Sequence, residues 1–127
     1  MTERATGTFV PTFEPLPTDD GEWLSRMRVL KTFEGDLAGT ARAEMLAFQS
    51  GEDGSAGYVA IDRFTGTLHG RRGSFVLQHS GLMDRGEPSL TVTVVPGSGT
   101  DELAGLRGTL EIVNDGGAHS YTFTYRL

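Results

Sequence analysis

The sequence predicts an all-β protein, an eight-stranded antiparallel meander β-barrel with at most one short helical turn. Three observations lead to this fold class. Eight short segments alternate apolar with polar residues and are rich in β-branched and aromatic side chains, which is typical of half-buried strands. Glycine occurs 18 times in 127 residues, about twice the average share of ~7%, and the glycines fall largely at turns and bends. No longer stretch shows the period of an amphipathic helix.

The first three expected strands follow from this alternation. Residues 5–13 form the first, because two of their phenylalanines fall on one face. The polar, proline-rich segment 15–21 is expected to be a linker. The second and third strands are expected at 26–33 and 37–49, separated by a Glu-Gly-Asp turn. The third is long and rich in alanine, and its small apolar residues favour one face.

The next three strands are bounded by polar hairpins. Segment 50–55 has the Gly, Asp and Ser content of a hairpin loop. It leads to a fourth strand at 57–68, which a glycine near its end is expected to bend. A fifth strand is expected at 73–80. A second polar hairpin, 84–87, leads to the sixth strand at 89–95, whose Leu-Thr-Val-Thr-Val-Val run alternates strongly.

The chain ends in a hairpin of two strands, 106–114 and 119–127, joined by an Asp-Gly-Gly loop. Aromatic residues alternate with threonines in the last strand. Two short segments have the composition to coil, 21–25 and 100–103. The second places acidic residues directly after a threonine, which suits a helix N-terminus.

Closure of the sheet is expected because eight strands joined in order would otherwise leave two exposed edges. A barrel removes both edges, and glycines at strand bends permit the sharp curvature that barrel corners need. A two-sheet sandwich is the alternative architecture. Residues 1–127 are expected to form a single domain, in which residues 1–25 include the first strand and the linker.

The composition limits the possible functions. The formal net charge of −6 argues against a nucleic-acid partner, because such proteins gather lysine and arginine around phosphates. No segment has the length and apolarity of a membrane span, and the N-terminus lacks the pattern of a signal peptide. The absence of cysteine excludes thiolate metal sites and cysteine nucleophiles. We therefore expect a cytoplasmic protein with no nucleic-acid partner and no membrane partner.

A glycine-rich segment carries a resemblance to a known barrel group. Residues 96–108 contain Gly-x-Gly, then a large apolar residue, then Gly-x-x-Gly, and resemble a turn in the allene oxide cyclase and dirigent barrels. Segments 73–81, 31–37 and 58–63 resemble a bacterial family of uncharacterised proteins in that group. The resemblance covers residues 26–127 and implies an eight-stranded antiparallel barrel with a small internal cavity. It implies no established reaction.

The chemistry of that group does not carry over. Plant allene oxide cyclases resemble this chain in fold but are described with an inward carboxylate beside a cysteine, and this chain has no cysteine. Cyclisation of a fatty-acid epoxide is therefore not expected. Dirigent proteins are secreted and steer radical coupling, whereas this sequence shows no signal peptide.

Two side chains are predicted to carry any chemistry inside the barrel. His79 shares a face of the fifth strand with Phe75 and Leu77, which predicts that it points inward. Asp62 shares a face of the fourth strand with Tyr58, and it could pair with His79 if the two strands are neighbours and this face points inward. The opposite face, with Val59 and Ile61, is at least as apolar, so either face could point inward. Such a pair could act in acid–base catalysis. Alternatively, it could be a structural ion pair, or His79 could be a core histidine bound to a backbone carbonyl.

Seven residues are predicted ligand contacts. They combine side chains on expected inner faces with a carboxylate on the third strand and an arginine after the glycine-rich turn, which could clamp a ligand carboxylate. They are Tyr58, Phe75, Leu77, Arg107, Tyr121, Phe123 and Glu44. Structural alternatives stay open, because the aromatic residues could be plain core, the glutamate could lie on the outer wall and the arginine could hold loop carbonyls.

Three functions are compatible with these predictions. The first is a small cytoplasmic β-barrel that binds an apolar or amphipathic small molecule in its lumen, since an eight-stranded barrel has room for one small ligand. The second is a cofactor-independent isomerase or cyclase that uses Asp62 and His79. The third is a non-catalytic module that forms homo-oligomers through a threonine-rich outer face of the sixth strand. No cofactor and no metal are expected, because the three histidines are scattered. Two of them, His69 and His119, lie near turns and are expected to be exposed.

Overall fold

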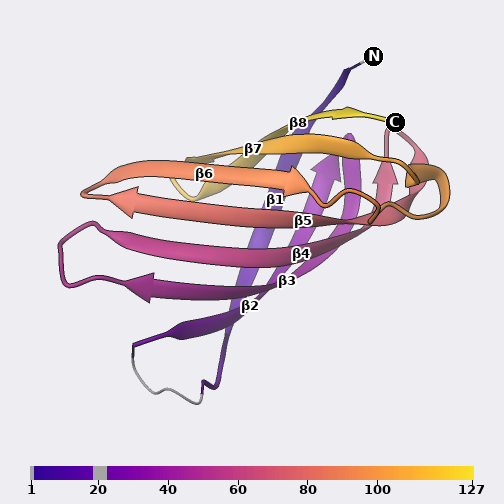
Figure 1. Ribbon diagram of the computed structural model, residues 1–127. Coiled ribbons are helices and arrows are strands. Elements are labelled where there is room, and N and C mark those ends of the chain that lie inside the picture. Colours follow the sequence, from indigo (N-terminus) through magenta and orange to yellow (C-terminus); the bar gives the residue numbers. More distant parts are fainter. Residues whose placement is uncertain (1, 19–22) are drawn as a thin grey trace.

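Eight antiparallel strands form a closed barrel in the computed structural model, which describes residues 2–18 and 23–127 (Figure 1). Each strand pairs with the next along the chain, and β1 also pairs with β8. The strands are β1 (Glu3–Leu16), β2 (Ser25–Gly35), β3 (Leu37–Gln49), β4 (Ala56–Leu68), β5 (Arg71–Asp84), β6 (Glu87–Val94), β7 (Arg107–Asp115) and β8 (Ala118–Arg126). The predicted all-β barrel is confirmed. The two-sheet sandwich is excluded, because the strand order closes on itself.

Helical structure in the described part of the chain is limited to one 3-10 turn, η1 (Asp101–Leu103). This is the turn predicted at residues 100–103. Of the other segment expected to coil, residues 21–22 lie outside the described residues and residues 23–25 form no helix. Across the described ranges, the structure holds no helix with the length and apolarity needed to cross a membrane.

The strands differ from their predicted bounds mainly at β1 and β5. β1 continues to Leu16 and so includes Pro15, which was expected in the linker; residues 19–21 of that linker lie outside the described residues. Beyond Phe9, β1 pairs with β2 but no longer with β8. This part of β1 therefore has a free edge, where proline is tolerated. β5 continues to Asp84 because both β4 and β6 pair with its last residues.

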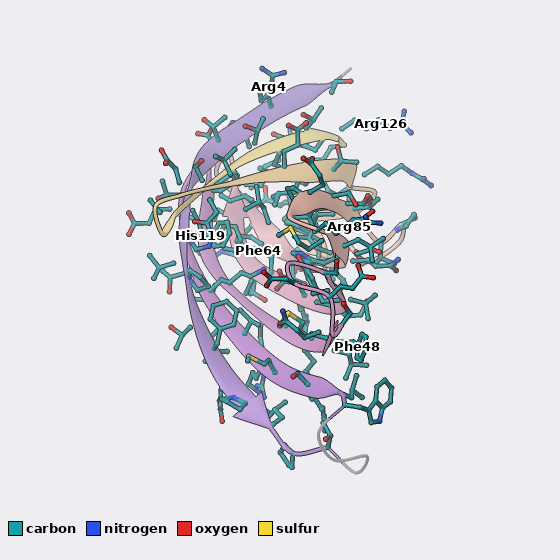
Figure 2. The ribbon with its side chains drawn as sticks, turned by 90° about the vertical axis from the view of Figure 1, so that its left-hand side faces the viewer. Arg4, Phe48, Phe64, Arg85, His119 and Arg126 are labelled. Carbon is teal, nitrogen blue, oxygen red and sulfur yellow. The ribbon has the colours of Figure 1, made fainter. Side chains whose placement is uncertain are left out.

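The barrel has two unlike ends. The turns from β2 to β3 and from β4 to β5, and the longer connection from β6 to β7, lie at the same end as both termini (Figure 1). We call this the capped end. The hairpins that join β3 to β4, β5 to β6 and β7 to β8 lie at the opposite, open end. Figure 2 looks toward the open end, into the ring of strands.

Aromatic side chains fill the capped half of the barrel. Consecutive rings around the interior have centroid separations between 5.1 and 5.6 Å, which is typical of favourable ring contacts. These rings belong to Phe9, Phe33, Phe64, Phe75, Phe123 and Tyr125. Leu103 and Leu106, from the connection that carries η1, are buried in the same cluster. This half of the lumen is a packed core.

Facing glycines let the strands bend sharply near the capped end. Gly66 on β4 pairs with Gly39 on β3 and with Gly73 on β5. A methyl group on Gly39 would lie 2.3 Å from the carbonyl oxygen of Thr65, well inside van der Waals contact. Only a residue without a side chain fits between two backbones this close.

We predict that Gly39→Ala lowers the free energy of unfolding by about 3 kcal/mol, because the new methyl group forces two backbones apart. Gly51→Ala is the matched control, since nothing lies within 4 Å of a methyl group there. Urea denaturation followed by circular dichroism measures both values. Equal stability of the two variants would show that the close approach at Gly39 does not constrain the barrel.

Candidate functional site

Three strands bring a charged cluster into the middle of the barrel. Side chains on a strand alternate between its two faces, and the inner positions include Lys31 on β2, Asp62 on β4 and His79 on β5. β3 separates β2 from β4, and its inner residues at this level, Ala41 and Ala43, are small. The lysine side chain can therefore reach across β3 to the aspartate.

Lys31 and His79 bind the same carboxylate oxygen. The Lys31 Nζ donates a hydrogen bond to Asp62 Oδ2 at 2.6 Å, and the His79 Nε2 donates to the same atom at 3.1 Å. The Asp62 side chain has no exposed surface, and those of His79 and Lys31 are 5% and 10% exposed. Burial of a carboxylate is costly without a nearby cation and hydrogen-bond donors. The two donors are therefore what permits Asp62 to lie inside the barrel.

The ionisation of Asp62 reflects opposing influences. Burial has the largest single effect and would raise the pKa of Asp62. The hydrogen bond from His79, together with the charge and the hydrogen bond of Lys31, outweighs it and holds the pKa of Asp62 below its ordinary value. Asp62 is therefore a carboxylate at neutral pH, and it accepts hydrogen bonds without donating any.

The position of the proton on His79 follows from this. Because the carboxylate only accepts, the Nε2 atom that faces it must carry the proton. In a neutral imidazole the other nitrogen, Nδ1, is then an acceptor. His79 lines a cavity, and no donor among residues 2–18 and 23–127 forms a hydrogen bond to Nδ1.

That cavity has a volume of about 550 Å³ and occupies the open half of the barrel, next to the charged cluster. Its volume lies within the range of roughly 300–1,000 Å³ that is typical of small-molecule sites. Most of its wall is apolar, and Lys31, His79 and His119 are among the few polar residues that reach it. Apolar residues of the wall include Phe13, Val29, Met45, Leu90 and Ile112, and Tyr58 adds a ring with a hydroxyl group.

The rim of the cavity exposes apolar side chains to solvent. Phe13 on β1 and Leu90 on β6 lie on inner faces but are 54% and 42% exposed. Inward apolar residues at the capped end, such as Leu68 and Leu103, are fully buried. Exposed apolar surface that is gathered in a concave site is typical of a place where a ligand or a partner binds.

The structure places the predicted site residues in three different environments. It brings together Asp62 and His79, the pairing expected if the Tyr58 face of β4 points inward, and Tyr58 lines the cavity with His79. Burial raises the pKa of the Tyr58 hydroxyl. The predicted contacts Phe75, Leu77 and Phe123 lie instead in the packed core, because neighbouring side chains occupy the space that a ligand would need.

Tyr121 has a structural role rather than the predicted contact with a ligand. Its hydroxyl accepts a hydrogen bond from the backbone N–H of Leu37 at 2.8 Å and lies 3.1 Å from the carbonyl oxygen of Glu34. These contacts fasten β8 to the turn between β2 and β3 at the capped end. The desolvation that accompanies them raises the pKa of Tyr121. Its polar atom is therefore already used by the fold.

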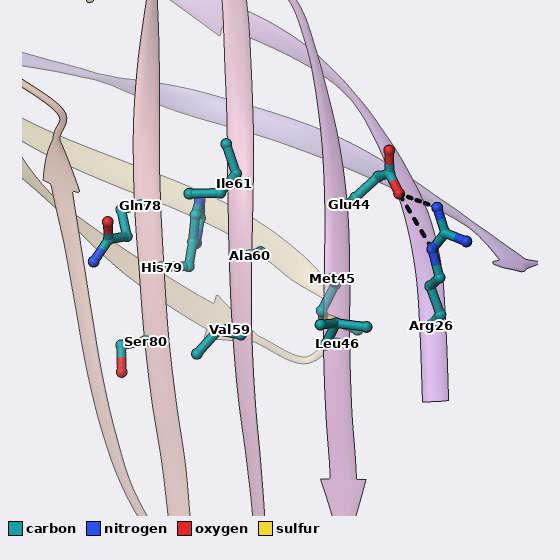
Figure 3. A pocket seen from close by; sticks show the side chains of 10 residues that line it. All are labelled: Arg26, Glu44, Met45, Leu46, Val59, Ala60, Ile61, Gln78, His79 and Ser80. Carbon is teal, nitrogen blue, oxygen red and sulfur yellow. Dashed lines mark hydrogen bonds and ion pairs between the residues drawn. The ribbon is translucent and has the colours of Figure 1, made fainter. Parts of the chain in front are cut away.

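Glu44 and Arg107, the charged residues predicted to contact a ligand, lie away from the cavity. Glu44 faces outward on β3 and accepts a hydrogen bond at 2.7 Å from Arg26, beside a groove on the outer wall (Figure 3). The hydrogen bond and the charge of Arg26 lower the pKa of Glu44. Arg107 is exposed at the start of β7, near the capped end, whereas Ile112 lines the cavity from farther along that strand.

Two residues of the site were not among the predicted ones. Lys31 is the single lysine of the chain and alternates with Val29 and Phe33 on β2, which was the available signal that it points inward. His119 was expected to be exposed but is half-buried, with its ring centroid 5.1 Å from that of Phe9. Its Nδ1 is buried without a hydrogen-bond partner among the described residues.

Within the same part of the chain, no group of three or more histidines and carboxylates is arranged to hold a metal ion.

We predict that Asp62 makes the stability of the protein depend on pH below about 4, the ordinary pKa of an aspartate. The pKa of Asp62 is lower in the folded state than in the unfolded state. The stabilisation that ionised Asp62 contributes is therefore complete above its pKa in the unfolded state, and it is lost as the pH falls through its pKa in the folded state. Asp62→Asn removes this dependence. At pH 7 the variant is less stable by about 3–5 kcal/mol, because Lys31 loses its buried counter-charge.

Unfolding by urea at several pH values between 2 and 7 measures this effect, and the difference between the two proteins should shrink toward low pH. Glu44→Gln is the control, because its ion pair with Arg26 lies on the exposed outer wall and contributes little. A constant difference between wild type and Asp62→Asn at all pH values would contradict the prediction.

Comparisons with known proteins show the family to which the chain belongs and agree with its fold. The family model described as "Protein of unknown function (DUF3224)" matches residues 5–125. A crystal structure of a DUF3224 protein of unknown function from Shewanella oneidensis MR-1 is 41% identical, with a TM-score of 0.95, and the match covers 100% of this chain and 98% of that one. No curated protein matches the chain significantly. The predicted membership of a family of uncharacterised proteins is thus confirmed, and the chain belongs to the DUF3224 family.

Proposed function

We propose that the protein binds one apolar or amphipathic small molecule in the open half of its barrel. The observation that carries the proposal is the cavity of about 550 Å³, which combines an apolar wall with Lys31 and His79 at its inner end. An apolar body would bury the rim residues, and a polar group would reach the two charged or polar side chains. The likeness to allene oxide cyclase barrels, itself still a prediction, supports this by analogy alone.

Burial of the ligand would supply most of the binding free energy. Each square ångström of apolar surface removed from water contributes about 25 cal/mol, and the rim residues Phe13 and Leu90 offer exposed apolar surface that a ligand would cover. The polar cluster would contribute less to affinity than to orientation, because its groups must lose their water to bind.

A cofactor-independent isomerase or cyclase is the second candidate function. The observation that favours it is the buried pair formed by Asp62 and His79, in which the carboxylate orients a histidine that reaches the cavity. A buried and pre-oriented base is what proton transfer without a cofactor requires. Once a ligand is identified, its chemical conversion by the protein can be measured directly.

We predict for this second function that His79→Ala lowers kcat by at least about 100-fold, the usual contribution of a general base. Asp62→Asn is expected to lower kcat less and to shift its pH profile, because it acts through His79. Gln78→Ala, whose side chain lies on the outer face beside His79, is the control. An activity that survives His79→Ala would exclude His79 as the catalytic residue.

The composition also bears on the cellular location and on partners other than a small molecule. We propose a cytoplasmic location and no nucleic-acid or membrane partner, supported by the net charge of −6 and the absence of cysteine. The outer wall carries the exposed residues Leu46, Val59 and Ile61, which would support a homo-oligomer. Light scattering measures the oligomeric state.

We predict that Ala47→Trp weakens the binding of Nile red, a neutral apolar fluorophore, by at least tenfold. Ala47 lines the cavity, so an indole there fills space that the ligand would occupy. Leu46→Trp is the matched control, because this neighbouring residue faces the outer wall. Fluorescence titration measures both affinities.

Two results would contradict binding in the lumen. One is the absence of saturable binding of Nile red, of 1-anilinonaphthalene-8-sulfonate and of a panel of natural lipophiles to the wild-type protein. The other is a loss of binding in Leu46→Trp with Ala47→Trp unaffected, which would place the ligand on the outer wall.

A further inference from the structure

Lys31, the single lysine of the chain, places its ammonium group at the wall of the cavity. Its Nζ atom lies 2.6 Å from Asp62 Oδ2, the oxygen that also accepts a hydrogen bond from His79, and 5.6 Å from the ring centroid of Phe9. Lys31, His79 and Phe9 all line the cavity, whereas Asp62 does not. The ammonium group therefore lies between the buried carboxylate and the open space.

Lys31 has bonding capacity that the fold does not use. An ammonium group has three N–H donors, and within residues 2–18 and 23–127 the bond to Asp62 is the one hydrogen bond that the Nζ atom makes. The side chain is only 10% exposed, so Asp62 rather than bulk water balances its charge. A buried lysine beside an apolar cavity is the kind of side chain with which proteins form imines from carbonyl compounds.

We propose that Lys31 forms a reversible imine with an apolar aldehyde bound in the cavity. The inference rests on the proposed function and names its ligand class. One ammonium proton passes to solvent, which frees the nitrogen lone pair to attack the carbonyl carbon. The carbonyl oxygen takes one proton from nitrogen and one from solvent and leaves as water, while a carbon–nitrogen double bond replaces the carbon–oxygen double bond. The third proton stays on nitrogen, so the imine carries the same single positive charge as the ammonium group.

The ion pair with Asp62 favours this product. Because the positive charge on nitrogen is conserved, Asp62 keeps its counter-charge, and the remaining N–H can donate to the same Oδ2 atom. The hydrogen bond from His79 holds the carboxylate in place while Lys31 reacts. The apolar wall keeps the aldehyde next to the amine, which raises their effective concentration, and the open end lets the released water leave.

Other ligand groups make less use of this arrangement. A carboxylate would place a second negative charge beside Asp62 and compete with it for Lys31. A hydroxyl group or an ether oxygen can accept a hydrogen bond from Lys31 but forms no covalent bond with it. The other basic side chains with N–H donors are arginines and histidines, which form no stable imine, so Lys31 is the one side chain of the protein with a primary amine.

The test is reductive trapping with 2-naphthaldehyde as the probe. Sodium cyanoborohydride reduces a protonated imine to a stable secondary amine, and mass spectrometry of the intact protein and of its peptides locates the adduct. We expect an adduct at Lys31 that forms at least about tenfold faster than that of free Nα-acetyl-lysine, because the cavity holds the aldehyde beside the amine. 2-Methylnaphthalene, which has the same apolar body without a carbonyl group, should slow the reaction by occupying the cavity.

Three variants locate the reaction. Lys31→Arg keeps a cation for Asp62 but cannot form an imine, so it should lose the adduct while its circular dichroism spectrum stays that of the wild type. Ala47→Trp, which fills the cavity, should slow the trapping at Lys31, and Leu46→Trp on the outer wall should not. The last two variants keep Lys31 and its ion pair, so they decide the question even where Lys31→Arg does not fold.

The outcomes separate the imine from the proposed function. No adduct at Lys31, a rate equal to that of free Nα-acetyl-lysine, or a rate that neither 2-methylnaphthalene nor Ala47→Trp lowers would overturn the imine site, and saturable binding of Nile red would then leave lumen binding in place. An adduct confined to the N-terminal amine would overturn the imine site as well. No adduct at Lys31 together with no binding of Nile red or of 2-methylnaphthalene would overturn both.

Discussion

The buried carboxylate of Asp62 is the constraint on which the arrangement of β2 to β5 depends. It needs two hydrogen-bond donors at once. Lys31 comes from β2, on the far side of β3, and His79 comes from the neighbouring strand β5. A slip of one residue in any of the intervening ladders would turn Lys31 or His79 to the outer face and leave a charge buried without compensation. The cluster therefore selects one register for four neighbouring strands.

The sizes of the inward residues divide the lumen into a core and a cavity. In the capped half the inner positions hold phenylalanine, leucine and tyrosine, which fill the space between the strands. In the open half, inner positions of β3, β4 and β5 hold Ala43, Ala47, Ala60 and Gly81. These residues keep the alternation that a strand requires but leave volume unfilled. The small size of these inward residues, rather than the barrel fold itself, therefore produces the cavity.

The sequence predicts the strands and the alternation of their two faces, but it does not fix which face of every strand turns inward or the depth at which a residue lies. Alternation was enough for the eight strands. It left the pairing of Asp62 with His79 open, because the two faces of β4 are similarly apolar. Phe75 and Leu77 share the inner face of β5 with His79 but lie deeper, in the packed half, because depth is set by the stagger of all eight strands. The contact of Lys31 with Asp62 across β3 could not be predicted either, because it depends on the small side chains of Ala41 and Ala43 between them.

The ionisation of the cluster narrows the chemistry that the site can perform. Asp62 is held as a carboxylate and lies behind its donors, so it has no proton to give to a ligand and acts only by orienting His79. Any proton transfer at this cluster then falls to His79 or Lys31, which contact Asp62 and also line the cavity. Binding of a ligand's polar group and transfer of a proton to or from it would use the same side chains. A binding protein and an isomerase built on this barrel would therefore share their ligand contacts, and they would differ in whether a proton is transferred.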